Sequence, residues 1–390
     1  MRPVRARDLG IAIGRGRPGP NNAITDVEGV AVGHTTLIDG DGPLHVGRGP
    51  VRTGVTVVLP RAADAWSEPV FAGCHRLNGN GELTGLEWVR ESGFLSTPIA
   101  ITNTHSVGVV RDALVAASIR PGSTFEQWWS LPVVGETYDG ILNDINGFHV
   151  RPEHVHAALA GAAGGRVAEG NVGGGTGMVC HEFKGGIGTA SRVIDEAGGG
   201  FTVGVLIQAN HGRREWLRVD GVPVGEHLGR DVIPSAFDGA GEPEDAGDRY
   251  GKAALPPPGS GSIIIVVATD APLLPHQCER LAQRAGLGIA RAGAIGGHTS
   301  GDLFIAFATG NRFAADGPTA RPTYELRALS DRFIDPLFMA TIEAAEEAVI
   351  NALLAAETMT GRDGHVAHAI PHDRLLEVLA RHGRGPLAGG

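Results

Sequence analysis

Ser262 is the residue with the clearest potential for chemistry, because it stands where a loose segment meets a run of β-forming residues. Residues 256–261 read Pro-Pro-Pro-Gly-Ser-Gly, and residues 263–267 read Ile-Ile-Ile-Val-Val. If the bond between Gly261 and Ser262 breaks, residue 262 gains a free α-amine beside its own hydroxyl. The amine can then serve as the base for that hydroxyl, so nucleophile and base belong to one residue. On the local pattern alone, an ordinary serine at the start of a strand is the commoner interpretation.

A second polar cluster precedes another apolar run. Residues 296–302 read Gly-Gly-His-Thr-Ser-Gly-Asp, and residues 303–307 read Leu-Phe-Ile-Ala-Phe. A glycine-rich turn of this kind can present the hydroxyl of Ser300 and the carboxylate of Asp302 to a site. Taken alone, the segment is better interpreted as a solvated turn.

Two strand ends carry further groups. Residues 135–140 read Gly-Glu-Thr-Tyr-Asp-Gly, where Glu136 could hold an ammonium group and Tyr138 could donate a hydrogen bond to an oxyanion. Residues 208–212 read Gln-Ala-Asn-His-Gly, and Asn210 there is a good oxyanion donor if a rigid strand fixes its amide. The plainer interpretation of both segments is a polar turn at the end of a strand.

The glycines at residues 173–177 invite a comparison with phosphate-binding loops. No Gly-Lys-Ser/Thr ending follows them, and no GxGxxG opens a helix there. We therefore expect these glycines to allow close backbone packing instead.

The sixteen histidines do not form a recognisable metal motif. HExxH is absent, and Pro371 prevents His365, His368 and His372 from sharing one helical face. The pair His181-Glu182 has no second ligand at a useful spacing. We expect neither a metal nor a cofactor.

Composition narrows the class of protein. The 390 residues carry a net charge of −10 with no block of Lys or Arg, which disfavours nucleic-acid and anionic-membrane partners. Three widely spaced cysteines indicate neither a disulfide framework nor a zinc knuckle. No apolar stretch reaches the roughly 18 residues of a spanning helix, and no apolar region follows the charged N-terminus. We expect a cytoplasmic protein.

The pattern of apolar residues predicts a mixed α/β or α+β chain. Strands are expected at residues 55–59, 98–102, 132–135, 202–208, 262–268 and 303–308. Helices are expected at residues 109–118, 153–163, 276–290, 336–357 and 373–382. The helix at 336–357 is expected to bury one face, formed by Ile342, Ala345, Val349 and Leu353. Residues 237–261, rich in Gly, Pro, Asp and Glu, are interpreted as a flexible linker.

Taken in order, these segments resemble one family. They are similar to the self-processing N-terminal-serine aminopeptidases of the L-aminopeptidase/D-esterase-amidase and β-aminopeptidase type. The resemblance runs from near the N-terminus to about His368, and it is the ordered set rather than any single motif that is diagnostic. The matching segments are residues 78–85, 102–108, 135–140, 170–178 with 183–189, 208–212, 261–272 and 300–302.

The resemblance implies a fold and a maturation step. It implies an α+β fold, a four-layer αββα sandwich like that of the N-terminal-nucleophile hydrolases but with different connectivity, formed by residues 1–390 as one domain. It also implies autocatalytic cleavage of the 237–261 linker before Ser262, which gives an α chain of residues 1–261 and a β chain of residues 262–390. The two fragments would stay associated and assemble into a homo-oligomer.

The resemblance also assigns roles to residues. Ser262 matches the nucleophile, and Ser300 matches the serine that orients it. Asp302 falls where the family places an acidic residue, often Glu. Tyr138 and Asn210 match the groups that stabilise the transition state, and Glu136 lies beside them. Asp302 or Glu136 would pair with the ammonium group of the substrate, which would limit the enzyme to free N-termini.

The implied activity is release of N-terminal amino acids from peptides, aminoacyl amides or esters, without a cofactor. An acyltransferase of the ornithine acetyltransferase type is the nearest alternative, although its nucleophile is typically threonine. A non-catalytic ligand-binding scaffold and a glycine-rich nucleotide binder are the alternatives from other classes. The sequence leaves the choice among L-α, D-α and β-amino acid substrates open.

Overall fold

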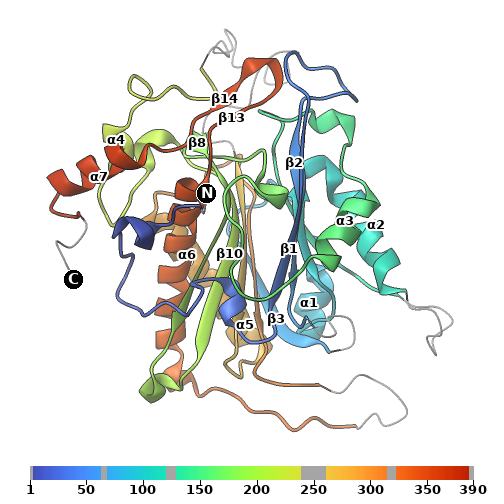
Figure 1. The fold of residues 1–390 in the computed structure, drawn as a ribbon. Coiled ribbons are helices and arrows are strands. Elements are labelled where there is room, and N and C mark those ends of the chain that lie inside the picture. The colour runs from blue at the N-terminus through green and yellow to red at the C-terminus, as the bar shows by residue number, and fades with distance from the viewer. Residues whose placement is uncertain (1–2, 63–67, 120–128, 239–260, 314–321, 386–390) are drawn as a thin grey trace.

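Two β-sheets stack face to face, and helices cover the outer face of each (Figure 1). The computed structural model describes residues 3–62, 68–119, 129–238, 261–313 and 322–385. Within these ranges, no helix has the length and apolar character needed to cross a membrane. The layers therefore follow the order helix, sheet, sheet, helix, which confirms the αββα architecture expected from the resemblance.

The larger sheet has six strands in the order β4-β3-β12-β11-β10-β9. All neighbours in it are antiparallel except β11 and β12, which are parallel. Strands that precede residues 239–260 in the chain and strands that follow them thus share one sheet. Residues 239–260 make up most of the expected linker, and they lie outside the described part of the chain. The strands are β3 (Val70–Arg76), β4 (Phe94–Leu95), β9 (Gly186–Val193), β10 (Thr202–Asn210), β11 (Ser262–Thr269) and β12 (Asp302–Ala308).

The smaller sheet has four strands in the order β1-β2-β5-β6. Its strands are β1 (Ala31–Asp39), β2 (Val51–Leu59), β5 (Ile99–Asn103) and β6 (Val133–Thr137). The pairs β1–β2 and β2–β5 are antiparallel, whereas β5 and β6 are parallel.

Alternation along β11 shows how the layers pack. Ile264, Val266 and Ala268 face the smaller sheet, where they meet side chains of β5 and β6. Ile263, Ile265 and Val267 face the opposite way, toward the helices α5 (Pro275–Arg291) and α6 (Asp335–Ala355). Because both faces of this strand are buried, its sequence is an unbroken apolar run rather than an alternating one.

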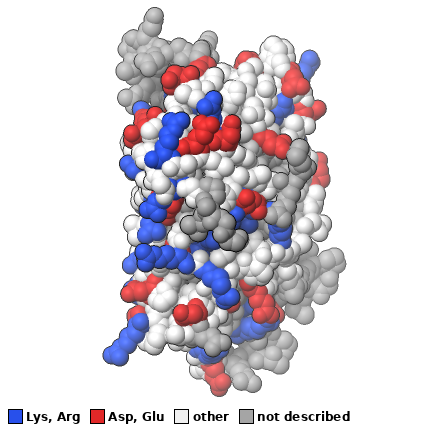
Figure 2. Space-filling model, turned by 60° about the vertical axis from the view of Figure 1, so that its left-hand side comes forward, with Lys and Arg blue, Asp and Glu red and all other residues white. Residues whose placement is uncertain are grey.

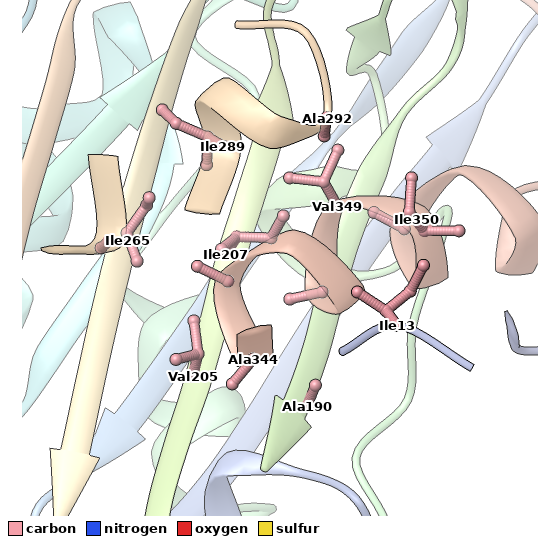
Figure 3. Close-up of a cluster of buried hydrophobic side chains, with 14 of the residues drawn as sticks. Ile13, Ala190, Val205, Ile207, Ile265, Ile289, Ala292, Ala344, Val349 and Ile350 are labelled. Carbon is pink, nitrogen blue, oxygen red and sulfur yellow. The ribbon is translucent and has the colours of Figure 1, made fainter. Parts of the chain in front are cut away.

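Helices complete the two outer layers. The core between the larger sheet and its helices includes Ile207 of β10, Ile265 of β11 and Val349 of α6 (Figure 3). On the other side, α2 (Val107–Ser118) and α3 (Pro152–Ala160) cover the smaller sheet. The remaining elements are α1 (Leu86–Ser92), α4 (Val224–His227), α7 (His372–Arg381) and the short strand pairs β7 (Val179–Cys180) with β8 (Phe183–Lys184) and β13 (Met359–Thr360) with β14 (Val366–Ala367).

The face of α6 predicted from its apolar residues is buried, and burial extends beyond it, because nearly every residue from Leu337 to Ala355 is buried. The carboxylates on its second face are covered because they find buried partners. Arg192 of β9 contacts Glu343 at 3.1 Å and Glu347 at 2.7 Å. These contacts join β9 to α6, so an arginine from another element neutralises the carboxylates of the helix.

The glycines at residues 173–177 pack closely against backbone, as expected. A Cβ added to Gly174 would lie 2.1 Å from Oε1 of Gln208, and one added to Gly175 would lie 2.4 Å from the backbone nitrogen of Ile187. On the molecular face drawn in Figure 2, residues of both charge signs are interspersed, with no large block of one sign. That distribution agrees with the absence of basic blocks in the sequence.

Candidate active site

Three strand ends meet at one edge of the larger sheet and bring the site together. In the parallel pair β11–β12, Ile263 lies opposite Asp302, so both strands begin side by side. In the antiparallel pair β10–β11, the last residue of β10, Asn210, lies directly opposite Ser262. Directly paired residues project their side chains to the same face of a sheet. Ser262 and Asn210 therefore share one face of the sheet, whereas Asp302, paired with Ile263, begins the neighbouring strand with its side chain on the other face.

Ser262 is buried, with 6% of its surface exposed, and it lies on the same face as Ile264, toward the smaller sheet. Its hydroxyl oxygen accepts a hydrogen bond from the backbone N–H of Gly301 at 3.0 Å. Before it, Gly261 has no room for a side chain, since an added Cβ would lie 1.8 Å from the carbonyl oxygen of Asn210. A glycine is thus required here by close backbone approach.

Ser300 and Asp302 interact directly. The Ser300 hydroxyl donates a hydrogen bond of 2.6 Å to Oδ1 of Asp302, and the side chains of both are buried. Burial raises the pKa of Asp302, while the hydrogen bonds from Ser300 and Asn78 act in the opposite direction. The turn formed by residues 300–302 therefore binds both hydroxyls. Its Gly301 N–H bonds to the hydroxyl of Ser262, and its Asp302 carboxylate bonds to the hydroxyl of Ser300.

Asn78, for which the sequence suggested no role, holds this carboxylate from the other side. Its Nδ2 donates to Oδ2 of Asp302 at 2.9 Å, and its Oδ1 accepts from the Asp302 backbone N–H at 2.6 Å. A further Nδ2 contact reaches the carbonyl oxygen of Gly297 at 3.2 Å. Because these contacts join residues more than 200 positions apart, nothing in the local sequence pattern could have indicated them.

Asn210 is fixed at both ends of its amide. Its Oδ1 accepts from the backbone N–H of Val179 at 2.8 Å, and its Nδ2 donates to the carbonyl oxygen of Tyr138 at 3.0 Å. An amide nitrogen carries two hydrogens, so one remains for a ligand. The amide is therefore oriented before any substrate arrives.

Tyr138 meets the site through its backbone. Its ring folds back over Gly140, where an added Cβ would lie 2.4 Å from the phenolic oxygen, and it packs beside Ile141 and Val179. Burial raises the pKa of its phenol, and Arg362 acts against that effect. The contact recorded between Tyr138 and Asn210 thus uses the carbonyl oxygen of Tyr138.

Glu136 and Gly301 both lie close to Gly81. A Cβ added to Gly81 would lie 3.0 Å from Oε1 of Glu136 and 3.1 Å from Cα of Gly301. The carboxylate accepts from the backbone N–H of Glu82 at 3.0 Å and from the hydroxyl of Thr104. Burial raises its pKa, and these hydrogen bonds lower it. A buried carboxylate with only neutral donors recorded around it is suited to receive an ammonium group.

A small pocket opens beside Ser300 and Asp302. Its wall combines these polar residues with apolar ones, Trp216 and Ile295 among them. The sequence predicted no role for Trp216 or Ile295, because neither belongs to a recognisable motif. The pocket is lined by His211, Gly212, Trp216, Ala294, Ile295, Gly296, Gly297, Ser300 and Asp302.

A fully buried lysine supports the segment that orients Asn210. Lys184 is one of only two lysines in the chain, and its Nζ donates to the carbonyl oxygens of Gly175, Met178 and Gly185 at 3.2, 2.9 and 2.7 Å. Met178 directly precedes Val179, whose N–H holds the Asn210 side chain. Burial lowers the pKa of Lys184 to about 7.

Comparison with known proteins first defines the class. The L-aminopeptidase D-Ala-esterase/amidase of Ochrobactrum anthropi, whose structure is described as a new variant among the Ntn hydrolase fold, superposes on this chain with a TM-score of 0.85. The two are 46% identical, and the match covers 97% of this chain and 99% of that one. The chain therefore has the fold of a hydrolase of the N-terminal-nucleophile type.

The family follows from the sequence match. Residues 22–367 match peptidase family S58, and the chain belongs to that family. It is therefore an enzyme that hydrolyses peptide bonds, which removes the scaffold and nucleotide-binder alternatives.

Two other similar proteins are β-aminopeptidases by name. The β-peptidyl aminopeptidase BapA of Sphingosinicella microcystinivorans is 50% identical over 383 residues, covering 97% of this chain and 93% of that protein. A β-aminopeptidase from Burkholderia sp. is 52% identical with a TM-score of 0.86, covering 97% of this chain and 99% of that one.

We predict that Asn78→Ala lowers kcat/KM by about 10- to 100-fold, the equivalent of losing one or two hydrogen bonds to a charged group. Without Asn78, Asp302 loses the donor that fixes its orientation toward Ser300. The measurement is steady-state hydrolysis of an aminoacyl p-nitroanilide. Asn80→Ala is the matched control, because the side chain of Asn80 makes an exposed hydrogen bond to the backbone oxygen of Thr299 and does not reach Asp302 among the described contacts. Equal effects of the two substitutions would contradict the role assigned to Asn78.

A second prediction concerns Lys184. Between pH 7 and 10.5 the unfolded chain binds a proton at this lysine that the folded chain does not, so this group makes stability rise with pH by up to about 1.4 kcal/mol per unit. Lys184→Met should remove that contribution, so wild type gains about 2–3 kcal/mol more than the variant between pH 7 and 9.

Denaturant unfolding at the two pH values measures this difference. Lys252→Met, which changes the other lysine of the chain, should keep the wild-type slope. Parallel pH profiles for wild type and Lys184→Met would show that the lysine is protonated in the folded protein.

Proposed function

We propose that this enzyme is an aminopeptidase that activates itself by cleaving the bond between Gly261 and Ser262. The observation that carries the proposal is the position of Ser262 at the first residue of a core strand, with its hydroxyl bonded to the Gly301 N–H and Asn210 directly opposite. Residues on both sides of the bond pair within one sheet, which supports continued association of residues 1–261 with residues 262–390 after cleavage.

The cleavage step uses only groups of this chain and water. The Ser262 hydroxyl attacks the carbonyl carbon of Gly261, the peptide bond breaks, and the nitrogen of residue 262 becomes a free amine. Water then hydrolyses the resulting ester and leaves a carboxylate on Gly261. The hydrogen bond from Gly301 to the attacking oxygen fixes the oxygen in place before the reaction.

In the mature enzyme, the α-amine of residue 262 takes the proton from its own hydroxyl as the oxygen attacks the acyl carbon of the substrate. An unperturbed α-amine has a pKa of about 7.7–8.0, so it is largely neutral near pH 8. The free hydrogen of the Asn210 amide stabilises the oxyanion. The Tyr138 hydroxyl is the second proposed donor, and its ring, which here lies over Gly140, turns toward the site to reach the oxyanion. The amine then protonates the leaving group, and water releases the acyl product.

Substrate recognition falls to the acidic groups and the pocket. Glu136 or Asp302 pairs with the ammonium group of the substrate, and Ser300 keeps Asp302 oriented through their 2.6 Å hydrogen bond. The names of two relatives, both at least 50% identical to this chain, support activity on peptides that begin with β-amino acids. We also propose that the processed units form a homo-oligomer. We further propose that the enzyme is cytoplasmic, and its three buried free cysteines support a reducing compartment.

Ser262→Ala should remain one full-length, inactive chain, because it lacks the oxygen that attacks Gly261. Mass spectrometry of the purified wild type should show two fragments divided before residue 262. The control is Ser260→Ala, which changes the other serine that follows a glycine in this segment and should be cleaved normally. Cleavage of Ser262→Ala at this bond would refute the proposed mechanism of maturation.

The substrate class has its own test. We expect β-alanyl p-nitroanilide to be hydrolysed with a kcat/KM at least about 10-fold above that of the D-alanyl and L-alanyl compounds, a difference of about 1.4 kcal/mol in transition-state binding. The measurement is initial rate against concentration for the three compounds at one pH. A higher kcat/KM for either α-amino acid would contradict the β-amino acid preference and leave the cleavage mechanism untouched.

A further inference from the structure

Three donor side chains converge next to the candidate site, two from neighbouring residues and one from a position 30 residues further along the chain. Cys180 ends β7, His181 follows it, and His211 follows the end of β10. A sulfur or nitrogen atom from each lies within 4.8 Å of the corresponding atoms of the other two, and all three residues are buried. The sequence offered His181 no second ligand at a useful spacing, and the fold brings His211 to it, since the backbone N–H of His181 donates to the carbonyl oxygen of His211 at 2.7 Å.

The imidazoles in this cluster have unused nitrogens. Nδ1 of His181 donates to the carbonyl oxygen of Arg213 at 2.9 Å, so its Nε2 keeps a lone pair, and it has no hydrogen-bond partner among the described residues. Nε2 of His211 is also buried without a partner in the described part of the chain, while its Nδ1 faces Sγ of Cys180 at 3.9 Å. A histidine that binds a metal usually donates its other ring N–H to a carbonyl or carboxylate, as His181 does here.

The backbone is arranged to seat the His181 ring. A Cβ added to Gly212 would lie 2.4 Å from Cε1 of that ring, so only glycine allows the ring its place. His181 and Glu182 both adopt positive φ angles, 47° and 62°, which residues other than glycine rarely do. Strained backbone of this kind persists where the surroundings hold it, and it is frequent at ligand sites.

We propose that Cys180, His181 and His211 form a binding site for Zn²⁺. One thiolate and two imidazoles are a typical zinc donor set with an open fourth position. In a tetrahedral site such donors lie roughly 3.5 Å apart, so the group contracts by about 1 Å when the ion binds. The Cys180 thiol loses its proton to solvent as the sulfur–zinc bond forms, which leaves one net positive charge on the ion and its thiolate.

Zn²⁺ bound here inhibits the enzyme, an inference that rests on the proposed role of Asn210. His211 follows Asn210 directly, and it also lines the pocket beside Ser300 and Asp302. When the cluster contracts, His211 moves toward Cys180 and draws the neighbouring Asn210 away from Ser262. The open fourth position of the ion then lies near the substrate pocket.

Cadmium binding tests the site without any need for activity, because Cd²⁺ bound to a thiolate gives a charge-transfer absorption band in the ultraviolet. Purified protein freed of metal with a chelator should bind one Cd²⁺ per chain with this band, and Zn²⁺ should displace it. Cys180→Ser should lose the band and weaken Zn²⁺ binding by at least about 100-fold.

Two controls make the test specific. Cys278→Ser should behave like wild type, since Cys278 is equally buried but packs in the apolar core, where its thiol donates to the carbonyl oxygen of Phe71 at 3.7 Å. His211→Gln should keep a thiolate but bind Zn²⁺ at least about 10-fold more weakly. Absence of the band in wild type would overturn the site, as would a band that survives Cys180→Ser.

Hydrolysis rates test the inhibition separately. Micromolar Zn²⁺ should slow the wild type, and a chelator should restore its rate. Cys180→Ser, compared with its own metal-free rate, should be insensitive to the same concentration. If Cd²⁺ binds with the charge-transfer band but Zn²⁺ leaves the wild-type rate unchanged, the inhibition is overturned while the site stands. If Ser262→Ala is inactive and uncleaved as proposed but gives the wild-type band, the site and the mechanism are both supported.

Discussion

The register of β11 between its two neighbours is the constraint on which the site depends. The side chain of Ser262 faces the smaller sheet because Ile264, Val266 and Ala268 fill the space between the sheets. A slip of one residue would turn the serine toward α5 and α6 and would bury polar groups in an apolar core. The apolar packing of both faces of this strand therefore orients the proposed nucleophile, and the parallel start of β12 adds Gly301 and Asp302 beside it.

Buried polar groups fix the orientation of the side chains that the strand pairing brings to the site. Asn78 holds the Asp302 carboxylate. Lys184 bonds to the carbonyl oxygen of Met178, and the next residue, Val179, orients the Asn210 amide. Each of these contacts lies in a dry environment, where a hydrogen bond is strong when made and costly when broken. The site is thus built from rigid strand ends, and side chains without a proposed role in the reaction hold these ends in place.

Much of this arrangement could be predicted from the sequence, and particular residues show why the rest could not. The strongly apolar strands and the helices were found by their periodicity, with boundaries shifted by a few residues. Strands β1, β3 and β9 were not predicted. In β9, polar residues such as Ser191 and Arg192 interrupt the apolar pattern, and their buried partners come from distant segments. Ser262, Ser300 and Asp302 were singled out because glycine-containing segments precede them, and their roles remain predictions from the resemblance. Asn78, Lys184 and the Cys180–His211 contact depend on tertiary structure and leave no local pattern.

The most direct test of the account is N-terminal sequencing of protein that hydrolyses an aminoacyl amide, with activity measured on the same samples at several stages of maturation. The account predicts a second N-terminus that reads Ser-Ile-Ile-Ile-Val, and activity that rises in proportion to its yield. Full activity in samples whose only N-terminus is the start of the translated chain would contradict the central claim, because no free amine would then stand beside the Ser262 hydroxyl.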